Sequence, residues 1–165
     1  MRLPWLAKKR PLDLVWLTDD LALGSAPLAS QWEAMFAAGV GAVLEIRSEE
    51  QDDVVMLEAR GVAYRRADVP DFGAPTPDEL HDLVLWAIER MQGRQRVLVH
   101  CRMGQGRSAM VACATLVALG FPLSVAYSML RAARPNVALS PKQVTVLESF
   151  AVRIEDERQQ PAQPT

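Results

Sequence analysis

Residues 97–108 read VLVHCRMGQGRS, an apolar run that ends in a cysteine and is followed by two glycines, an arginine and a serine. The β-branched run before Cys101 predicts a buried strand, and the small and apolar residues from Ser108 to Leu119 predict a buried helix. Backbone N–H groups in a loop between a strand and a helix can converge on an anion, and the helix dipole favours negative charge there. The stretch therefore predicts an anion-binding cup at the end of a strand.

Five residues separate Cys101 from Arg107 within this loop. Gly104 and Gly106 allow backbone conformations that other residues avoid. Arg107 offers a planar, charged fork that suits two phosphate oxygens. We expect the loop N–H groups and the arginine to lower the pKa of Cys101 from about 8.5 into the range of roughly 3.5–7.5 seen for activated cysteines. A buried cysteine is often an inert core residue, but this context favours a nucleophile directed at phosphorus.

The stretch HCRMGQGRS, residues 100–108, resembles the signature loop of the cysteine-dependent protein tyrosine phosphatases, in which a His-Cys pair, five residues and an arginine precede Ser or Thr. Three further stretches resemble the small dual-specificity branch of that superfamily, and together the matches span about residues 14–152. They are WLTDDLALGSAP (residues 16–27), DVPDFGAPTPDEL (residues 68–80) and ARPNVALSPKQ (residues 133–143). The resemblance implies an α/β phosphatase that works through a phosphocysteine and needs no metal or other cofactor.

A phosphatase of this kind needs a proton donor, because attack on a phosphate ester expels an oxyanion. The residues alone leave Asp68 and Asp71 as competing candidates in a turn-rich segment. The resemblance assigns the general acid to Asp71, within the Pro-Asp-Phe stretch, and keeps Asp68 as the second candidate. The hydroxyl of Ser108 is placed to hydrogen-bond the thiolate of Cys101 as the phosphocysteine breaks down, and the alternative role of this serine is ordinary helix-start chemistry.

The remaining site residues are expected to bind the phosphate or to support the loop. His100 precedes the nucleophile in the strand, so its side chain should point away from the phosphate and orient the loop through hydrogen bonds. Gln143 matches a glutamine that positions water in some relatives, but its place in a predicted capping box also explains it without catalysis. The phosphate-binding set consists of Arg102, Met103, Gly104, Gln105, Gly106 and Arg107.

The composition is that of a soluble globular protein: 165 residues, 50% of them hydrophobic, with a net charge of −2. The charge gives no indication of nucleic-acid binding, and no apolar stretch reaches the roughly 18 residues of a membrane span. Residues 1–14 carry their basic cluster after the apolar residues, the reverse of a secretory signal, so we expect a cytoplasmic protein. Cys113 lies too far along the predicted helix to bridge Cys101 and is interpreted as a core residue.

The alternation of strands and helices predicts an α/β fold, with a central, mainly parallel sheet flanked by helices and a phosphatase-type phosphate-binding loop at the carboxyl ends of the strands. We expect one catalytic domain over residues 1–158 and a disordered tail over residues 159–165, which is rich in proline and glutamine. The expected strands are 14–17, 21–23, 42–46, 62–65 and 97–101, and the expected helices are 31–38, 53–60, 76–92, 108–119, 124–133 and 140–157.

These observations predict a phosphatase of phosphate monoesters in proteins, acting on phosphotyrosine and also on phosphoserine or phosphothreonine. The interior of the loop carries one additional cation, Arg102, and no lysine, whereas relatives of inositol-phosphate specificity carry more basic residues there. The alternatives are a phosphatase of a phospholipid or inositol phosphate, a non-catalytic phosphate-binding module, and a rhodanese-like sulfurtransferase. The expected partner is a phosphorylated protein or small phosphate monoester, with neither nucleic acid nor an integral membrane association.

Overall fold

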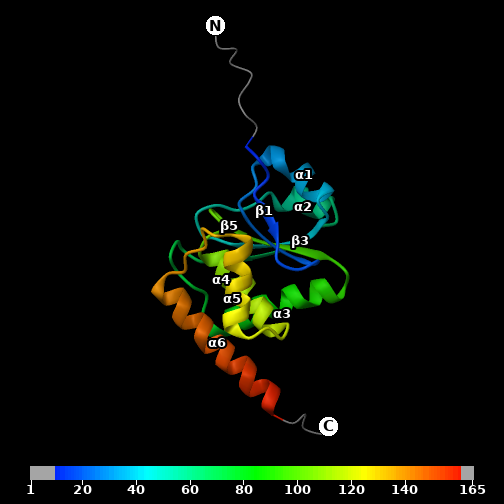
Figure 1. Ribbon diagram of the computed structural model, residues 1–165. Helices are drawn as coiled ribbons and strands as arrows, with labels where there is room; N and C mark the ends of the chain where they lie inside the picture. The colour runs from blue at the N-terminus through cyan, green and yellow to red at the C-terminus, as the bar shows by residue number, and fades with distance from the viewer. Residues whose placement is uncertain (1–9, 161–165) are drawn as a thin grey trace.

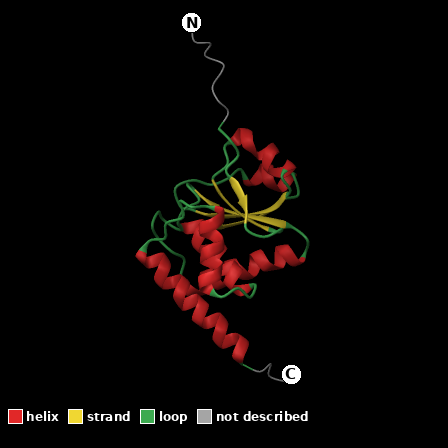
Figure 2. Ribbon diagram, in the orientation of Figure 1, coloured by secondary structure: helices red, strands yellow, loops and turns green. Residues whose placement is uncertain are grey.

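A five-stranded sheet lies between two layers of helices in the computed structural model, which describes residues 10–160 (Figures 1 and 2). The strand order is β1-β2-β5-β3-β4, in which β1 and β2 form an antiparallel hairpin and all the other neighbours are parallel. This confirms the predicted α/β fold with a mainly parallel central sheet. The strands are β1 (Leu14–Trp16), β2 (Leu21–Ser25), β3 (Val40–Ile46), β4 (Ala63–Ala67) and β5 (Arg96–Cys101).

The two helical layers differ in size. A short 3-10 turn (Ala29–Gln31), α1 (Trp32–Ala37) and α2 (Val54–Ala59) cover one face of the sheet. The other face is covered by α3 (Pro77–Gln92), α4 (Arg107–Ala118), α5 (Leu123–Ala133) and α6 (Pro141–Gln159). Every helix and strand predicted from the sequence is present among residues 10–160, with ends that differ by at most two residues.

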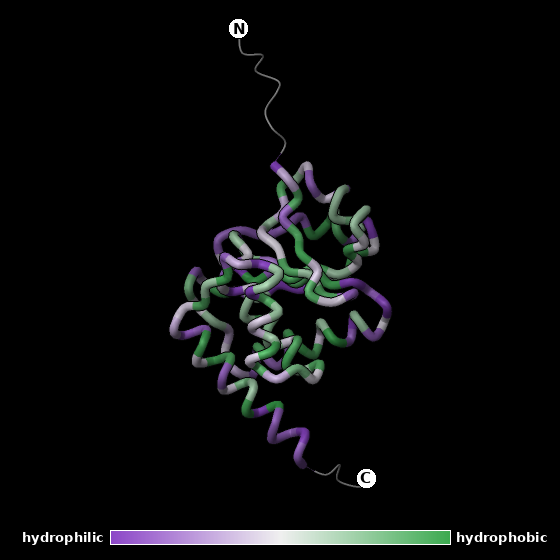
Figure 3. The backbone as a smooth tube through the Cα atoms, in the orientation of Figure 1, coloured by the Kyte–Doolittle hydropathy of each residue, from purple (hydrophilic) through white to green (hydrophobic). Residues whose placement is uncertain are grey.

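Alternation along β5 divides the buried side chains between two hydrophobic cores, one on each face of the sheet. Val97 and Val99 pack in the larger core with α3, α4, α5 and α6, whereas Leu98 packs in the smaller core with Trp32 and Leu57. Figure 3 shows the hydrophobic colour concentrated around the sheet and the helices packed against it, while the end of α6 is hydrophilic. Because β5 is central and α4 is buried along almost its whole length, the loop between them is fixed at both ends.

The strand β2 continues two residues beyond its predicted end at Leu23. The extension runs through Gly24, where a Cβ atom would lie 2.4 Å from the carbonyl oxygen of Asp13. A glycine usually argues against a strand interior, but here it permits the close approach of the neighbouring backbone. The extension brings Ser25 into register with Cys101 at the carboxyl end of β5.

Two helices begin with the predicted capping boxes. Thr76 caps α3 together with Glu79, and Ser140 caps α6 together with Gln143, each with a proline in the first turn. The tail predicted for residues 159–165 lies outside the described residues except for its start, where Gln159 is the last residue of α6. No helix within residues 10–160 is both long and apolar enough to cross a membrane.

Candidate active site

The site is centred on the phosphate loop, residues 101–107, which joins the end of β5 to the start of α4. Gly104 has φ +68°, and a Cβ there would lie 2.6 Å from the carbonyl oxygen of Gly24, so the loop requires glycine at this position. This backbone turn directs the N–H of Gly104 to the sulfur of Cys101, at 3.3 Å. The hydroxyl of Ser108 donates to the same sulfur at 3.1 Å.

These contacts change the acidity of the Cys101 thiol, which is almost fully buried. Burial alone raises the pKa of the thiol, but hydrogen bonds from Ser108 and Gly104 and the charge of Arg107 outweigh it, so the pKa of Cys101 is lowered from its ordinary value. The other cysteine, Cys113, has no such partners, and burial raises its pKa to about 12. Both thiols are free, and only Cys101 has the environment of a nucleophile.

Arg107 lies beside the thiol with its guanidinium almost completely buried. Its two terminal nitrogens donate to the two carboxylate oxygens of Glu49 at 2.7 and 2.6 Å, and one of them also donates to the carbonyl of Val69 at 2.9 Å. The hydrogen bonds from Arg107 lower the pKa of Glu49 to about 2. Glu49 therefore holds the arginine in one orientation, a role that we did not predict for this residue.

Asp71 lies on a separate loop, residues 68–73, which we call the Asp71 loop. Its carboxylate is 3.6 Å from Arg107, accepts the N–H of Phe72 at 3.0 Å, and has a side chain that is 67% exposed. Asp68, the competing candidate, lines a different hollow with Arg65 and other residues and does not line the cup. The structure thus brings Asp71 to the phosphate loop and leaves Asp68 outside it.

The start of α6 holds the Asp71 loop in place. The hydroxyl of Ser140 donates to the carbonyl of Phe72 at 2.8 Å, and the side-chain amide of Gln143 donates to the carbonyl of Gly73 at 2.9 Å. The amide oxygen of Gln143 accepts the N–H of Ser140 at 2.9 Å, as the capping box requires. Gln143 therefore caps a helix and anchors the Asp71 loop, and it also reaches the wall of the cup.

The cup is a pocket of about 190 Å³ that opens to solvent. Most of the residues predicted to bind phosphate line this pocket. Gly104 does not line it, and its N–H instead donates to the sulfur of Cys101. The pocket is lined by Asp71, Phe72, Cys101, Arg102, Met103, Gln105, Gly106, Arg107, Ala138 and Gln143.

A second arginine supports the phosphate loop from outside the cup. Arg134, at the end of α5, donates to the carbonyl of Met103 at 2.8 Å and forms a two-point ion pair with Asp13 at 2.6 and 2.7 Å. The hydrogen bonds that Arg134 donates to Asp13 lower the pKa of the Asp13 carboxyl group. Arg134 is buried, and its two terminal nitrogens make these contacts, so it fixes the loop backbone and does not line the pocket.

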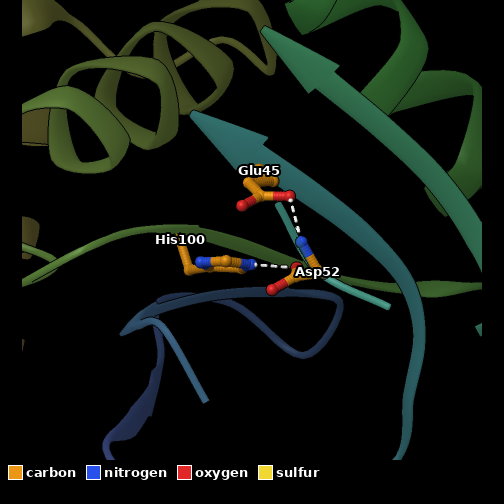
Figure 4. A group of neighbouring side chains, drawn as sticks. All are labelled: Glu45, Asp52 and His100. Carbon is orange, nitrogen blue, oxygen red and sulfur yellow. Dashed lines mark hydrogen bonds and ion pairs between the residues drawn. The ribbon is translucent and has the colours of Figure 1, made fainter. Parts of the chain in front are cut away.

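His100 precedes Cys101 in β5, so by alternation its side chain points to the opposite face of the sheet. There it meets a group of buried charges (Figure 4). Its Nε2 is 2.6 Å from the carboxylate of Asp52, and its Nδ1 is 3.2 Å from the carbonyl oxygen of Cys101. Asp52 also accepts from Arg47 at 3.1 Å, and its N–H donates to Glu45 at 3.0 Å.

Glu45, Asp52 and His100 are also the group, within residues 10–160, whose side chains could together hold a metal ion. Arg47 already contacts both carboxylates of this group, because its guanidinium forms ion pairs with Glu45 and with Asp52. A side chain of the protein therefore supplies positive charge to this group of buried carboxylates.

The carboxylates Glu49 and Asp52 both belong to residues 47–53, between β3 and α2, which we call the acidic loop. We did not predict a role for this loop, because a run of charged residues is usually a solvated turn. One signal was present: Glu45 interrupts the apolar strand that precedes the loop, and a charge in a buried strand requires a partner.

The sequence of the chain matches the model of a known protein family. The model of a family described as a polymorphic toxin system DSP-PTPase phosphatase matches residues 20–121, which include β2, the Asp71 loop and the phosphate loop. No curated protein matches the chain in sequence.

Solved structures match almost over their whole length. Tk-PTP in its active form superimposes with a TM-score of 0.80 and 28% identity, covering 86% of this chain and 97% of its own. Human DUSP28 gives 0.78 and 26%, covering 88% and 97%. PTPMT1 in complex with PI(5)P gives 0.81 and 24%, covering 88% and 98%, and shows the shared fold alone.

Proposed function

The chain belongs to the DSP-PTPase phosphatase family of polymorphic toxin systems, and we propose that it hydrolyses phosphate monoesters in proteins, phosphotyrosine above all, through a phosphocysteine intermediate. One observation carries this proposal. A thiol with a lowered pKa, a buried guanidinium and a carboxyl group all face the same small pocket, in Cys101, Arg107 and Asp71. A nucleophile, an anion clamp and a proton donor are the three groups that transfer of a phosphoryl group to a thiol requires.

In the first step the thiolate of Cys101 attacks phosphorus, so that an S–P bond forms as the P–O ester bond breaks. The leaving oxygen takes the proton of the Asp71 carboxylic acid. Arg107 and the N–H groups of the phosphate loop stabilise the charge on the other phosphate oxygens. The products of this step are the free alcohol or phenol, the phosphocysteine and an ionised Asp71.

In the second step a water molecule attacks the phosphocysteine. The carboxylate of Asp71 accepts a proton from that water, a new P–O bond forms, and the S–P bond breaks to regenerate the thiolate. The hydroxyl of Ser108, which donates to the sulfur of Cys101 at 3.1 Å, stabilises the leaving thiolate. Inorganic phosphate then leaves, and both catalytic residues have returned to their starting states.

The rim of the pocket favours an aromatic phosphate ester on a protein. Phe72 and Met103 both line the pocket, and their side chains are among the most exposed large apolar ones within residues 10–160. They offer an apolar surface to the ring of a phosphotyrosine. Apart from Arg107, the cationic lining consists of Arg102, which is too little charge to favour a substrate with several phosphates.

The decisive experiment is Cys101→Ser, assayed on an aryl phosphate and on phosphotyrosine, phosphoserine and phosphoinositide substrates. We expect hydrolysis to fall by at least about 10⁴-fold, because the alcohol is a far weaker nucleophile, while inorganic phosphate still binds. The control is Cys113→Ala, which removes the buried thiol in α4 and should leave turnover unchanged. Retained turnover in Cys101→Ser contradicts the mechanism, and faster hydrolysis of phosphoinositide vesicles than of phosphopeptides contradicts the protein substrate.

The role of Asp71 is tested by changing the leaving group. We expect Asp71→Asn to slow hydrolysis of phenyl phosphate by about 10²-fold and that of p-nitrophenyl phosphate much less, because a good leaving group needs no proton. Asp68→Asn is the matched control, three residues away and outside the cup. Equal losses with both esters would remove Asp71 from the acid role.

A further inference from the structure

We propose that Ser140 is a positioning residue for the proton donor. Its hydroxyl holds Phe72 in a left-handed backbone conformation, and that conformation orients the carboxyl group of Asp71 at the pocket. This inference rests on the proposed function, because Asp71 donates a proton only in that mechanism.

Phe72 has an unfavourable backbone conformation. Its φ is +58°, and only one other residue that is not glycine, Arg94, has a positive φ within residues 10–160. The left-handed region is disfavoured for L-residues, most of all for bulky ones, because the Cβ approaches the carbonyl oxygen. Burial of the ring does not offset this cost, since Phe72 is 75% exposed. Backbone contacts must therefore hold Phe72 in place, as is common for strained residues at functional sites.

The peptide group that follows Phe72 is held at both of its ends. The hydroxyl of Ser140 donates to the carbonyl oxygen of Phe72 at 2.8 Å. At the other end, the N–H of Gly73 donates to the carbonyl of Pro70 at 2.9 Å. The bond to Pro70 lies within the Asp71 loop, whereas the bond from Ser140 comes from the start of α6. Gln143 binds the next carbonyl, that of Gly73, so Ser140 is the residue that acts on Phe72 itself.

The orientation of Asp71 depends on this conformation of Phe72. The φ angle of Phe72 sets the peptide group before it relative to the one after it, and Ser140 fixes the one after it. The N–H of Phe72 belongs to the first of these groups and donates to Oδ1 of Asp71 at 3.0 Å. The same oxygen lies 3.6 Å from Nη2 of Arg107. The carboxyl group is thereby held by Oδ1, which leaves Oδ2 to carry the proton to the leaving group.

Loss of the Ser140 hydroxyl should therefore act on Asp71. The side chain of Asp71 is 67% exposed, so packing does not hold it. Without the bond from Ser140, the backbone of Phe72 is free to relax to a negative φ, and its N–H then turns away from Oδ1. The acid stays on the loop but is aligned with the leaving oxygen for less of the time, which slows the step in which it donates its proton.

Ser140 also caps α6, and the experiment has to separate that role from the one proposed. The hydroxyl accepts the N–H of Gln143 at 3.2 Å while it donates to Phe72. Glycine is tolerated at an N-cap with little loss of helix stability but has no hydroxyl, whereas threonine keeps it. Thr76→Gly is the matched control, because Thr76 caps α3 in the same way and its hydroxyl accepts the N–H of Glu79.

The experiment compares Ser140→Gly, Ser140→Thr and Thr76→Gly by kcat/KM on phenyl phosphate and on p-nitrophenyl phosphate. We expect Ser140→Gly to lose about tenfold on phenyl phosphate and less than about twofold on p-nitrophenyl phosphate, whose leaving group needs no proton. Ser140→Thr and Thr76→Gly should stay close to the wild type with both esters. A loss in Ser140→Gly that is the same for both esters, or no loss at all, overturns the proposal.

A double variant tests whether Ser140 acts through Asp71. Asp71→Asn removes the proton donor, so the addition of Ser140→Gly to it should cause no further loss of activity on phenyl phosphate. Losses that multiply in the double variant would show that Ser140 acts elsewhere and would overturn the proposal.

Hydrogen exchange at the amide of Gly73, followed by NMR, needs no substrate. We expect this N–H, which donates to Pro70, to exchange about tenfold faster in Ser140→Gly than in the wild type or Thr76→Gly, because the loop opens more often. An unchanged exchange rate overturns the proposal. A protein that hydrolyses no phosphate ester but shows the faster exchange contradicts the proposed function and leaves the positioning of the loop in place. An active phosphatase with none of these changes contradicts the role of Ser140 alone.

Discussion

The phosphate loop and the acidic loop meet at the same edge of the sheet but contribute different groups to the site. The phosphate loop supplies the thiol, the N–H donors and the guanidinium that face the pocket. The acidic loop lines none of this pocket, yet Glu49 binds Arg107 and Asp52 binds His100, on either side of the nucleophile. The phosphate loop thus carries groups that react, and the acidic loop carries groups that hold them in place.

The largest expected effect belongs to the phosphate loop. We expect Arg107→Lys to lower kcat/KM for an aryl phosphate by about 10³-fold, because an ammonium cannot present two parallel donors to phosphate and bind both oxygens of Glu49. Arg153→Lys, in an exposed ion pair on α6, is the control and should change little. A loss below about tenfold would show that the charge alone suffices and that the fork is unimportant.

A smaller effect is expected in the acidic loop. Glu49→Gln keeps one acceptor for Arg107 but loses the two-point ion pair, so we expect kcat to fall by about tenfold as the guanidinium loses its orientation. The neighbouring Glu50→Gln, whose largely exposed side chain contacts Arg47, should retain most activity. If Glu49→Gln lost as much activity as Arg107→Lys in steady-state assays, Glu49 would contribute as much to catalysis as the guanidinium itself, and its role would not be limited to orienting Arg107.

The smallest effect concerns stability at acidic pH. The pKa of Glu49 is about 2 in the folded protein and 4.5 in an unfolded chain, so the carboxylate stabilises the fold above about pH 4.5 and loses this effect as the pH falls toward 2. We expect the free energy of unfolding to differ between the wild type and Glu49→Gln by less than about 1 kcal/mol at neutral pH, since the pair is partly exposed. Denaturant unfolding at several pH values should show the difference shrinking in acid; a constant difference would contradict this account.

The phosphate loop and the elements around it could be predicted because their signals are local. Strand and helix periodicity, two capping boxes and a thiol separated from an arginine by five residues all lie within short stretches of chain. The turn-forming residues alone did not separate Asp71 from Asp68, only three residues away, and the preference for Asp71 came from the resemblance. Contacts from the start of α6 to Phe72 and Gly73 accompany the position of Asp71 at the cup, and those contacts cross about seventy residues.

The sequence by itself determined the strand, the loop and the helix that build the anion-binding cup, because consecutive residues can reach one another whatever the rest of the chain does. Only the tertiary structure decided which carboxylates support the cup. Strand β5 lies between β2 and β3, and that order places the acidic loop, about fifty residues earlier in the chain, beside both His100 and Arg107. A charged run in a sequence does not show which buried cation it will meet, since that depends on how the strands are ordered in the sheet.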